Sequence, residues 1–361
     1  MTAPQDIQTW LREHADQLDT EQLLAEEVVP QLANAGLFAI GVPQTYGGSG
    51  GDIRDAINAI AEVAEYSLTS AFVFWGHRTF IEYLLHSPNH ALAERWIPKL
   101  LEGERAGATG LSNAMKFLSG IESLQIVATP TEQGFQLDGS LAWITNLRKG
   151  GFVAAAAVSS SVDAPPAIVS FSSDYDGVQR SADLDLMALR GSNTAALKLQ
   201  NVHIDAADVI HADARQYLPA VRPSFLGLQC GMSIGLARAS LRAALNLTAN
   251  ASASARGELG VRIEESQKTL QHTVAELLTG VHKGSFKTNA PPLFKLRLKL
   301  AEIVQQAVTL ELQASGGRAY LQDQDKNFAR RWREAAFIPI VTPSLTQLQI
   351  ELQKHAATQA A

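Results

Sequence analysis

Apolar residues recur at intervals of three and four along the first third of the chain, residues 6–101. This period places apolar side chains on one face of a helix, so it predicts a mostly helical region. Four of the five residues 47–51 are glycine, and prolines stand at 88 and 98, where regular structure is disfavoured. We therefore expect several helices here, with a turn at the glycines and breaks at the two prolines.

The same helical period returns after residue 213 and continues to the end of the chain. The longest periodic segments are residues 226–250, 264–283 and 294–315. Segments of this length are typical of helices that pack side by side in a bundle.

Between residues 105 and 208 the pattern changes to short apolar runs separated by Pro, Gly, Asp and Ser. Runs of this length with turn residues between them favour β-strands. The predicted strands are 125–129, 134–139, 152–158, 167–171 and 195–202. The sequence thus predicts a mainly α fold with a central β-domain, divided into residues 1–105, 106–212 and 213–361.

Composition narrows the classes of protein that this pattern allows. The chain has 361 residues, enough for two or three domains, with 30 Lys and Arg against 36 Asp and Glu. A net charge of −6 disfavours nucleic acid as a partner. The single cysteine, Cys230, fits a reducing compartment, and neither a signal-peptide pattern nor a long uncharged apolar run occurs. We expect a soluble, cytoplasmic protein without membrane insertion.

Familiar catalytic motifs are missing from the sequence. The glycine loop at 47–51 lacks the Lys-Ser/Thr ending of a phosphate-binding loop, so a turn between helices is the favoured interpretation. His86 and His90 are separated by Pro88, and no Cys-x-x-Cys pair or Gly-x-Ser-x-Gly elbow occurs. No metal site is expected, and demanding chemistry would need a bound cofactor.

Trp143-Ile144-Thr145-Asn146 ends the predicted strand that begins near Phe135. Trp143 and Thr145 are two residues apart and so face the same side of a strand. The pair is either a core tryptophan beside a turn or a surface that stacks on, and hydrogen-bonds to, a planar heterocycle.

Basic residues cluster at Lys295, Arg297 and Lys299, and again in the segment 330–333. Such clusters are most often solvated helix faces. The alternative is a local pocket for a phosphorylated ligand.

Five separated motifs give the chain a family resemblance over residues 20–352. Together with the helix-strand-helix order, the motifs are similar to those of the acyl-CoA dehydrogenase family of FAD-dependent flavoproteins. They are residues 36–52 ending in Tyr-Gly-Gly-Ser-Gly-Gly-Asp, 96–104, the Trp-Ile-Thr-Asn strand, Arg256-x-x-Leu259-Gly260 with Gln267, and Gln313-Ala314-Ser315-Gly316-Gly317.

The resemblance implies a helical N-terminal domain, a middle β-barrel or sandwich and a C-terminal four-helix bundle. It also implies FAD bound between the last two parts and completed by a neighbouring subunit, hence a homodimer or homotetramer. The expected partners are an acyl-CoA or other acyl thioester and an electron acceptor or flavin reductase. Residues assigned to the cofactor by the resemblance are Leu111, Ser112, Trp143, Thr145, Arg256, Gln267, Gln313, Gly316, Gly317 and Ser344, and those assigned to the substrate are Ser119 and Arg222.

The sequence departs from the family where a carboxylate should take a proton from the substrate. The usual Glu of a Tyr-Glu-Gly-Thr segment is replaced by Thr342, and the second position known in the family, before Arg222, holds Val221. The family's Thr-Glu-Pro and Gly-Ser-Asp signatures are also missing from residues 112–120, where only Ser119 offers a substitute serine.

Three hypotheses remain open from the sequence. The first is an acyl thioester dehydrogenase with its base elsewhere, at Glu122, Glu334 or His77. The second is a flavin monooxygenase or oxidase of the same fold, with His77 over the flavin. The third is a non-catalytic flavoprotein or subunit.

Overall fold

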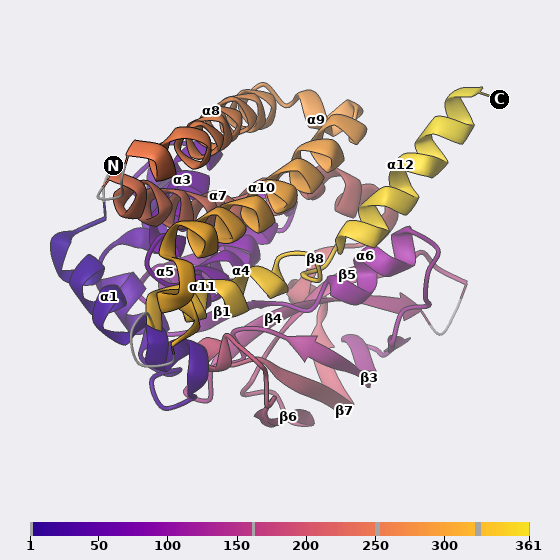
Figure 1. Ribbon diagram of the computed structural model, residues 1–361. Coiled ribbons are helices and arrows are strands. Elements are labelled where there is room, and N and C mark those ends of the chain that lie inside the picture. The colour runs from indigo at the N-terminus through magenta and orange to yellow at the C-terminus, as the bar shows by residue number, and fades with distance from the viewer. Residues whose placement is uncertain (1–2, 161–162, 250–252, 322–325, 361) are drawn as a thin grey trace.

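The computed structural model describes residues 3–160, 163–249, 253–321 and 326–360. Helices come first, strands occupy the middle of the chain and helices return to the end, so the predicted mainly α fold with a central sheet is confirmed (Figure 1).

Helix α4 is buried along nearly its whole length, and the other N-terminal helices cover part of it. A capping box at Asp52 starts α3, directly after the glycine turn that the sequence predicts. The expected break at Pro98 is wrong, because α5 runs through it. Burial of Trp96, Ile97 and Leu100 offsets the one backbone hydrogen bond that proline cannot donate. The helices are α1 (Gln5–Thr20), α2 (Val28–Asn34), α3 (Ile53–Ala64), α4 (Leu68–Leu85) and α5 (His90–Leu101).

The strands pair in the order β6-β7-β3-β2-β4-β5-β8, with β1 parallel to β4. Most neighbours are antiparallel, and β2 joins β4 through a short parallel contact. All five predicted strands are present, and the sequence missed β1, β6 and β8. The bounds are β1 (Ala106–Thr109), β2 (Ile126–Pro130), β3 (Gly134–Ile144), β4 (Phe152–Ser160), β5 (Ala167–Ser172), β6 (Val178–Asp183), β7 (Ala195–Asp205) and β8 (Val209–His211).

A short helix, α6 (Ser112–Leu118), follows β1, in a segment where the sequence indicated no regular element. The C-terminal helices pack above the sheet in Figure 1, and α12 extends from the body toward the C-terminus. Both α8 and α10 pack on α7, and α11 and α12 pack on α10. Their bounds are α7 (Ala214–Ala249), α8 (Ala253–His282), α9 (Ser285–Thr288), α10 (Pro291–Ser315), α11 (Lys326–Phe337) and α12 (Leu345–Ala360).

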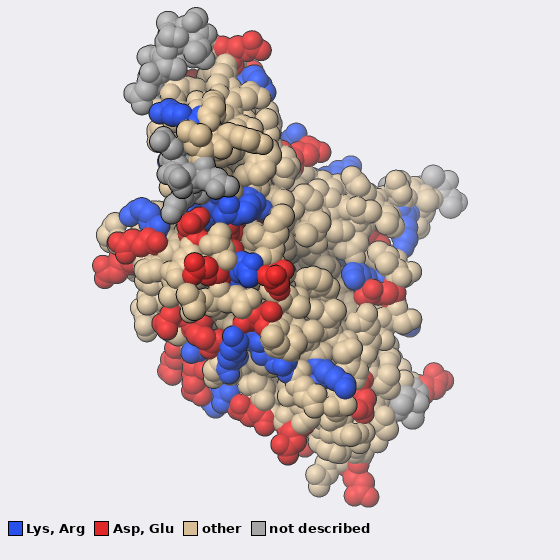
Figure 2. Space-filling model, turned by 60° about the horizontal axis from the view of Figure 1, so that its bottom comes forward, with Lys and Arg blue, Asp and Glu red and all other residues tan. Residues whose placement is uncertain are grey.

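One continuous apolar core runs from the N-terminal helices through the sheet into the C-terminal helices. Helix α4 contacts both β1 and α7, so packing crosses the expected boundaries near residues 105 and 212, which stay a prediction. Acidic and basic side chains intermingle over the face in Figure 2. Within the described residues, no helix combines the length and apolarity needed to cross a bilayer.

Candidate functional site

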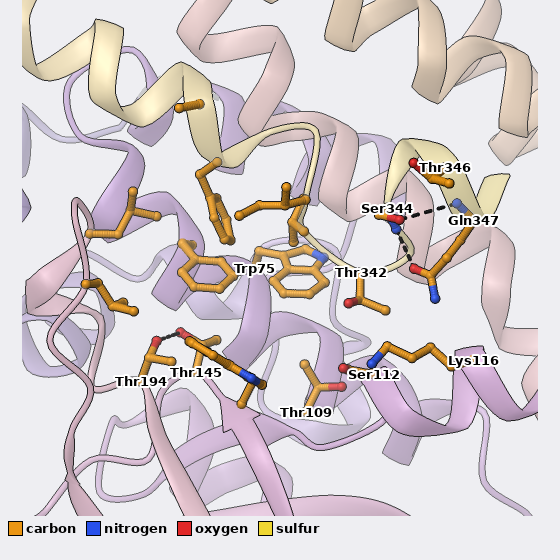
Figure 3. Close-up of a pocket in the computed structure, with 18 of the residues that line it drawn as sticks. Trp75, Thr109, Ser112, Lys116, Thr145, Thr194, Thr342, Ser344, Thr346 and Gln347 are labelled. Carbon is orange, nitrogen blue, oxygen red and sulfur yellow. Dashed lines mark hydrogen bonds between the residues drawn. The ribbon is translucent and has the colours of Figure 1, made fainter. Parts of the chain in front are cut away.

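A cavity of about 710 Å³ lies where the three parts of the fold meet. Its walls come from α4, the ends of β1 and β3, α6 and the residues after it, the segment before β7, α7, and the end of α11 with the connection to α12 (Figure 3). The volume falls within the range typical of small-molecule sites. The cavity is therefore the candidate functional site.

The floor of the cavity is aromatic. Phe72 and Trp75 of α4 stack at 5.7 Å between ring centroids, and Phe225 of α7 meets Trp75 edge-on at 5.3 Å. Phe337, at the end of α11, contacts Phe72 edge-on at 4.7 Å. This packing fixes the rings, so the floor presents a rigid apolar surface to a ligand.

Trp143 and Thr145 form the wall at the end of β3. Both line the cavity, so the expectation that they face the same side is confirmed. The Trp143 side chain is 64% exposed, which is unusual for a large apolar residue, whereas the Thr145 hydroxyl is buried and lies 2.9 Å from that of Thr194. An indole left accessible beside a fixed hydroxyl fits the edge and face of a planar heterocycle.

Helix α6 and the residues that follow it supply the polar wall opposite Thr342 (Figure 3). Lys116 pairs with Glu122 at 3.3 Å, and Glu122 accepts a hydrogen bond of 2.8 Å from Asn113. Asn113 also bonds the backbone of Ser123 and Gln125, so it holds the carboxylate in place. Of the described residues that line the cavity, Glu122 alone carries a carboxylate.

Thr342 lies on the cavity wall, at the position where the family resemblance expects a glutamate. Two residues on, Ser344 caps α12 together with Gln347: the backbone N–H of Ser344 donates to Gln347 Oε1 at 2.6 Å, and the Gln347 N–H donates to Ser344 Oγ at 3.3 Å. Ser344 also lines the cavity. Val221 is fully buried, so neither family position places a carboxylate in the site.

His77 is not over the cavity, contrary to the oxygenase hypothesis. Its ring stacks on Phe38, its Nε2 lies 3.0 Å from the Leu100 carbonyl oxygen, and its Nδ1 accepts from Gly107 N–H at 3.1 Å. Burial lowers the pKa of His77 to about 3. His77 is a neutral, hydrogen-bonded core histidine, so it cannot act as a base in the cavity.

Glu334 is likewise buried away from the cavity. It accepts a hydrogen bond of 3.0 Å from Leu68 N–H, at the start of α4, and lies 3.5 Å from Arg330. Burial raises the pKa of Glu334 to about 7. Glu334 therefore joins α11 to α4, and of the three candidate bases only Glu122 reaches the cavity.

The expectation of solvated basic faces is wrong for three arginines. Arg297, Arg330 and Arg331 are buried. Arg331 forms a buried ion pair with Glu311 of α10. A cluster of basic residues in the sequence does not show which acidic residue will pair with one of them.

Several residues that the resemblance assigns to ligands lie outside the cavity wall. Gln267 lies on α8, whereas Gln313, Gly316 and Gly317 lie at the end of α10, where Gln313 accepts a hydrogen bond of 3.0 Å from Arg262. Arg256 is on α8, and its side chain is outside the described part of the structure. Their roles stay predictions.

Leu111 and Ser119 flank α6, Arg222 lies on α7, and the roles of all three also remain predictions. Leu111 is buried just before α6 and does not line the cavity, whereas its neighbour Ser112 does. Ser119 accepts from Lys354 through its carbonyl oxygen at 2.5 Å. Arg222 packs over the Phe294 ring at 5.1 Å, and burial lowers its pKa.

Sequence reasoning missed most of the cavity. Lys116 carried no signal because α6 is too short to show a helical period. Arg333 lines the cavity while bonding Asp19 at 2.8 Å. Asp19 is 314 residues away in sequence. Ser344 stands three residues before Gln347, which is the spacing of a helix-capping pair, so this contact could have been predicted from the sequence. The remaining missed wall residues include Phe72, Trp75, Thr109, Leu186, Met187, Leu189, Thr194 and Phe225.

Comparison with known proteins shows what the chain and its fold resemble. Residues 3–104 match the family profile described as "Acyl-CoA dehydrogenase, N-terminal domain". The fold resembles that of the glutaryl-coenzyme A dehydrogenase glutaryl-CoA complex with a TM-score of 0.82 at 18% identity, covering 97% of this chain and 93% of that one. The N-terminal part of the chain thus matches the acyl-CoA dehydrogenase family, and the chain has the fold of solved acyl-CoA dehydrogenases.

Individual relatives are distant. The chain is 28% identical to mitochondrial isovaleryl-CoA dehydrogenase of Pongo abelii over 57% of this chain and 51% of that protein. It is 22% identical to acryloyl-CoA reductase (NADH) of Anaerotignum propionicum, over 90% of this chain and 85% of that protein. The matched region spans about half the length of the isovaleryl-CoA dehydrogenases.

Proposed function

We propose that the protein is an FAD-dependent oxidoreductase that acts on the α and β carbons of an acyl thioester held in the cavity. The observation that carries this proposal is the wall itself, where an accessible indole and a fixed hydroxyl at the end of β3 adjoin an aromatic floor. The names of the relatives, which are acyl-CoA dehydrogenases and an acyl-CoA reductase, support the same substrate class.

The residues of the cavity fit a flavin. Trp143 would cover the ring, Thr145 would hydrogen-bond to its edge, and Ser112 and Ser344 would meet it at the starts of α6 and α12. Leu111 would meet the ring through its backbone, because its side chain is buried outside the cavity. A bound flavin would supply the acceptor for a hydride. Residues outside the cavity would hold the rest of FAD from a second subunit of a homodimer or homotetramer: Arg256, Gln267, Gln313, Gly316 and Gly317.

Glu122 is our candidate for the base that accepts the α-proton of the substrate. Its carboxylate is 29% exposed on the cavity wall and is oriented by Asn113 and Lys116. Ser119, at the end of α6, and Arg222, on α7, would contact the polar part of the thioester. Electrons would leave to a separate acceptor protein or flavin reductase.

The test is anaerobic addition of an acyl-CoA panel to FAD-loaded protein. We expect bleaching of the flavin by at least one thioester, and we expect Glu122→Gln to slow bleaching by about 10²- to 10⁴-fold because the general base is lost. Glu132→Gln, in an exposed turn, is the matched control and should leave the rate unchanged. Bleaching that is equally fast in Glu122→Gln would exclude Glu122 as the base.

Thr342→Glu tests the alternative that the base is simply missing. The substitution puts a carboxylate on the wall at the family position, so it should create or raise thioester oxidation if no other defect exists. No gain across the panel would count against that alternative.

The monooxygenase or oxidase of the same fold is the second candidate. It is favoured by one observation, the neutral Thr342 where a dehydrogenase needs a carboxylate. Oxygen uptake that depends on a flavin reductase and an added substrate, without anaerobic bleaching by any thioester, would establish it.

A further inference from the structure

Arg297 of α10 is a fully buried guanidinium without an acidic partner. Its exposure is 0%, and no carboxylate in the described part of the chain lies within ion-pair distance of it. Burial lowers its pKa. Burying an unpaired charge costs several kcal/mol, so an apolar residue of similar size would serve the core better unless the arginine has another role.

The hydrogen bonds of Arg297 lead to the connection between α11 and α12. Its Nη2 donates to the Ile338 carbonyl oxygen at 2.6 Å, and its Nε donates to Gln229 Oε1, on α7, at 2.9 Å. Gln229 in turn donates from Nε2 to the Thr342 carbonyl oxygen at 2.9 Å. The two side chains therefore hydrogen-bond to both ends of the segment 338–342, which carries Thr342 on the cavity wall.

The arginine also decides which way the Gln229 amide points. A guanidinium only donates hydrogen bonds, so Gln229 must turn its oxygen toward Arg297. Its NH₂ group is then left facing Thr342, whose carbonyl oxygen only accepts. A neutral apolar residue at 297 would leave the amide free to rotate.

We propose that Arg297 and Gln229 are positioning residues that fix the segment 338–342 and thereby set the place of the side chain at 342 in the cavity. This inference deepens the proposed function and rests on it, because the cavity is taken to be the site that binds the thioester. Neither residue lines the cavity, so both act through the backbone that they hold.

The decisive variant is Gln229→Glu. A carboxylate keeps an acceptor for Arg297 and provides its missing counter-ion, but it cannot donate to Thr342 and repels that carbonyl oxygen. The fold should keep its melting temperature within a few degrees while the segment loosens. Gln305→Glu is the matched control, because Gln305 of α10 makes the same kind of bond, at 2.9 Å, to Ala335 of α11 rather than to the segment.

Hydrogen exchange measures the loosening without any ligand. The amides of Ile340, Val341 and Leu345 are hydrogen-bonded to carbonyls of residues 337 and 339, so they report on the segment. We expect exchange there to rise about tenfold in Gln229→Glu and to stay unchanged in Gln305→Glu. Each variant loses one hydrogen bond, but only the bond lost in Gln229→Glu holds the segment 338–342. Unchanged exchange in Gln229→Glu, or an equal rise in both variants, would overturn the inference.

Two further measurements keep the outcome clear. If Gln229→Glu does not fold, the double variant Arg297→Met with Gln229→Leu replaces the network by apolar side chains and should show the same local rise in exchange; full protection would overturn the inference. In FAD-loaded Gln229→Glu, flavin should stay bound. The apparent affinity for a thioester, measured from the change in the flavin spectrum, should fall at least about tenfold. An unaltered thioester affinity would contradict positioning, whereas failure of the wild-type protein to bind flavin would contradict only the proposed function.

Discussion

Single ionisable groups decide what the cavity can do. Thr342 offers no proton acceptor at the family position, and His77 and Glu334 are held elsewhere by buried hydrogen bonds. Glu122 remains, although its distance from Thr342 in sequence gave no reason to prefer it over the other two. Chemistry at this scale follows from burial and contacts, which spacing along the chain does not specify.

His77 makes a prediction for stability against pH. Its pKa is about 3 in the folded protein and 6.5 in an unfolded chain, so the unfolded state binds the proton more readily between these values. Stability from this group is complete above pH 6.5 and is lost as the pH falls toward 3, by up to roughly 1.4 kcal/mol per pH unit.

The variant His77→Gln isolates this effect. Glutamine can keep a donor to Leu100 and an acceptor for Gly107 but does not titrate. In denaturant unfolding between pH 4 and 7, chosen to span about this window, the variant should lose stability less steeply than the wild type. Equal slopes for the two proteins would show that His77 does not carry the effect.

At the scale of elements, helices α3 and α7 owe their close packing to glycines at four-residue spacing. A Cβ at Gly231 would lie 2.8 Å from Ile57 O, and one at Gly235 would lie 2.0 Å from Ala61 O. Because both obstacles are backbone atoms, Gly235→Ala should destabilise the protein by about 3 kcal/mol or more.

Gly260→Ala is the control for that substitution. Gly260 lies inside α8 with nothing within 4 Å of a new Cβ, so alanine there should be neutral or stabilising by up to about 1 kcal/mol. The midpoints of urea unfolding compare the two variants. A midpoint for Gly235→Ala equal to that of the control would contradict the close approach of α3 and α7.

Most elements could be predicted from their own residues, and the exceptions have physical reasons. The strand ending in Trp143 and the glycine turn before α3 were predicted because their signals are local. The helix α6 and the strands β1 and β8 are too short to show a period. Pro98 was misjudged because tertiary burial outweighs a local preference.

At the scale of the whole molecule, the order of helices and strands was predictable but the cavity was not. Trp75 joins Phe225 across 150 residues, and Arg333 joins Asp19 across 314. Such pairs exist only once the chain has packed, so a single sequence identifies the wall at Trp143 and Thr145 but not the floor or the polar side.

A structure of the FAD-loaded protein with a thioester tests the account most directly. We predict that the flavin ring contacts Trp143 and Thr145, that the acyl group lies over the aromatic floor, and that Glu122 comes within about 3 Å of the acidic carbon or of a water bound to it. A flavin bound elsewhere, or a thioester that lies outside the cavity, would contradict the account.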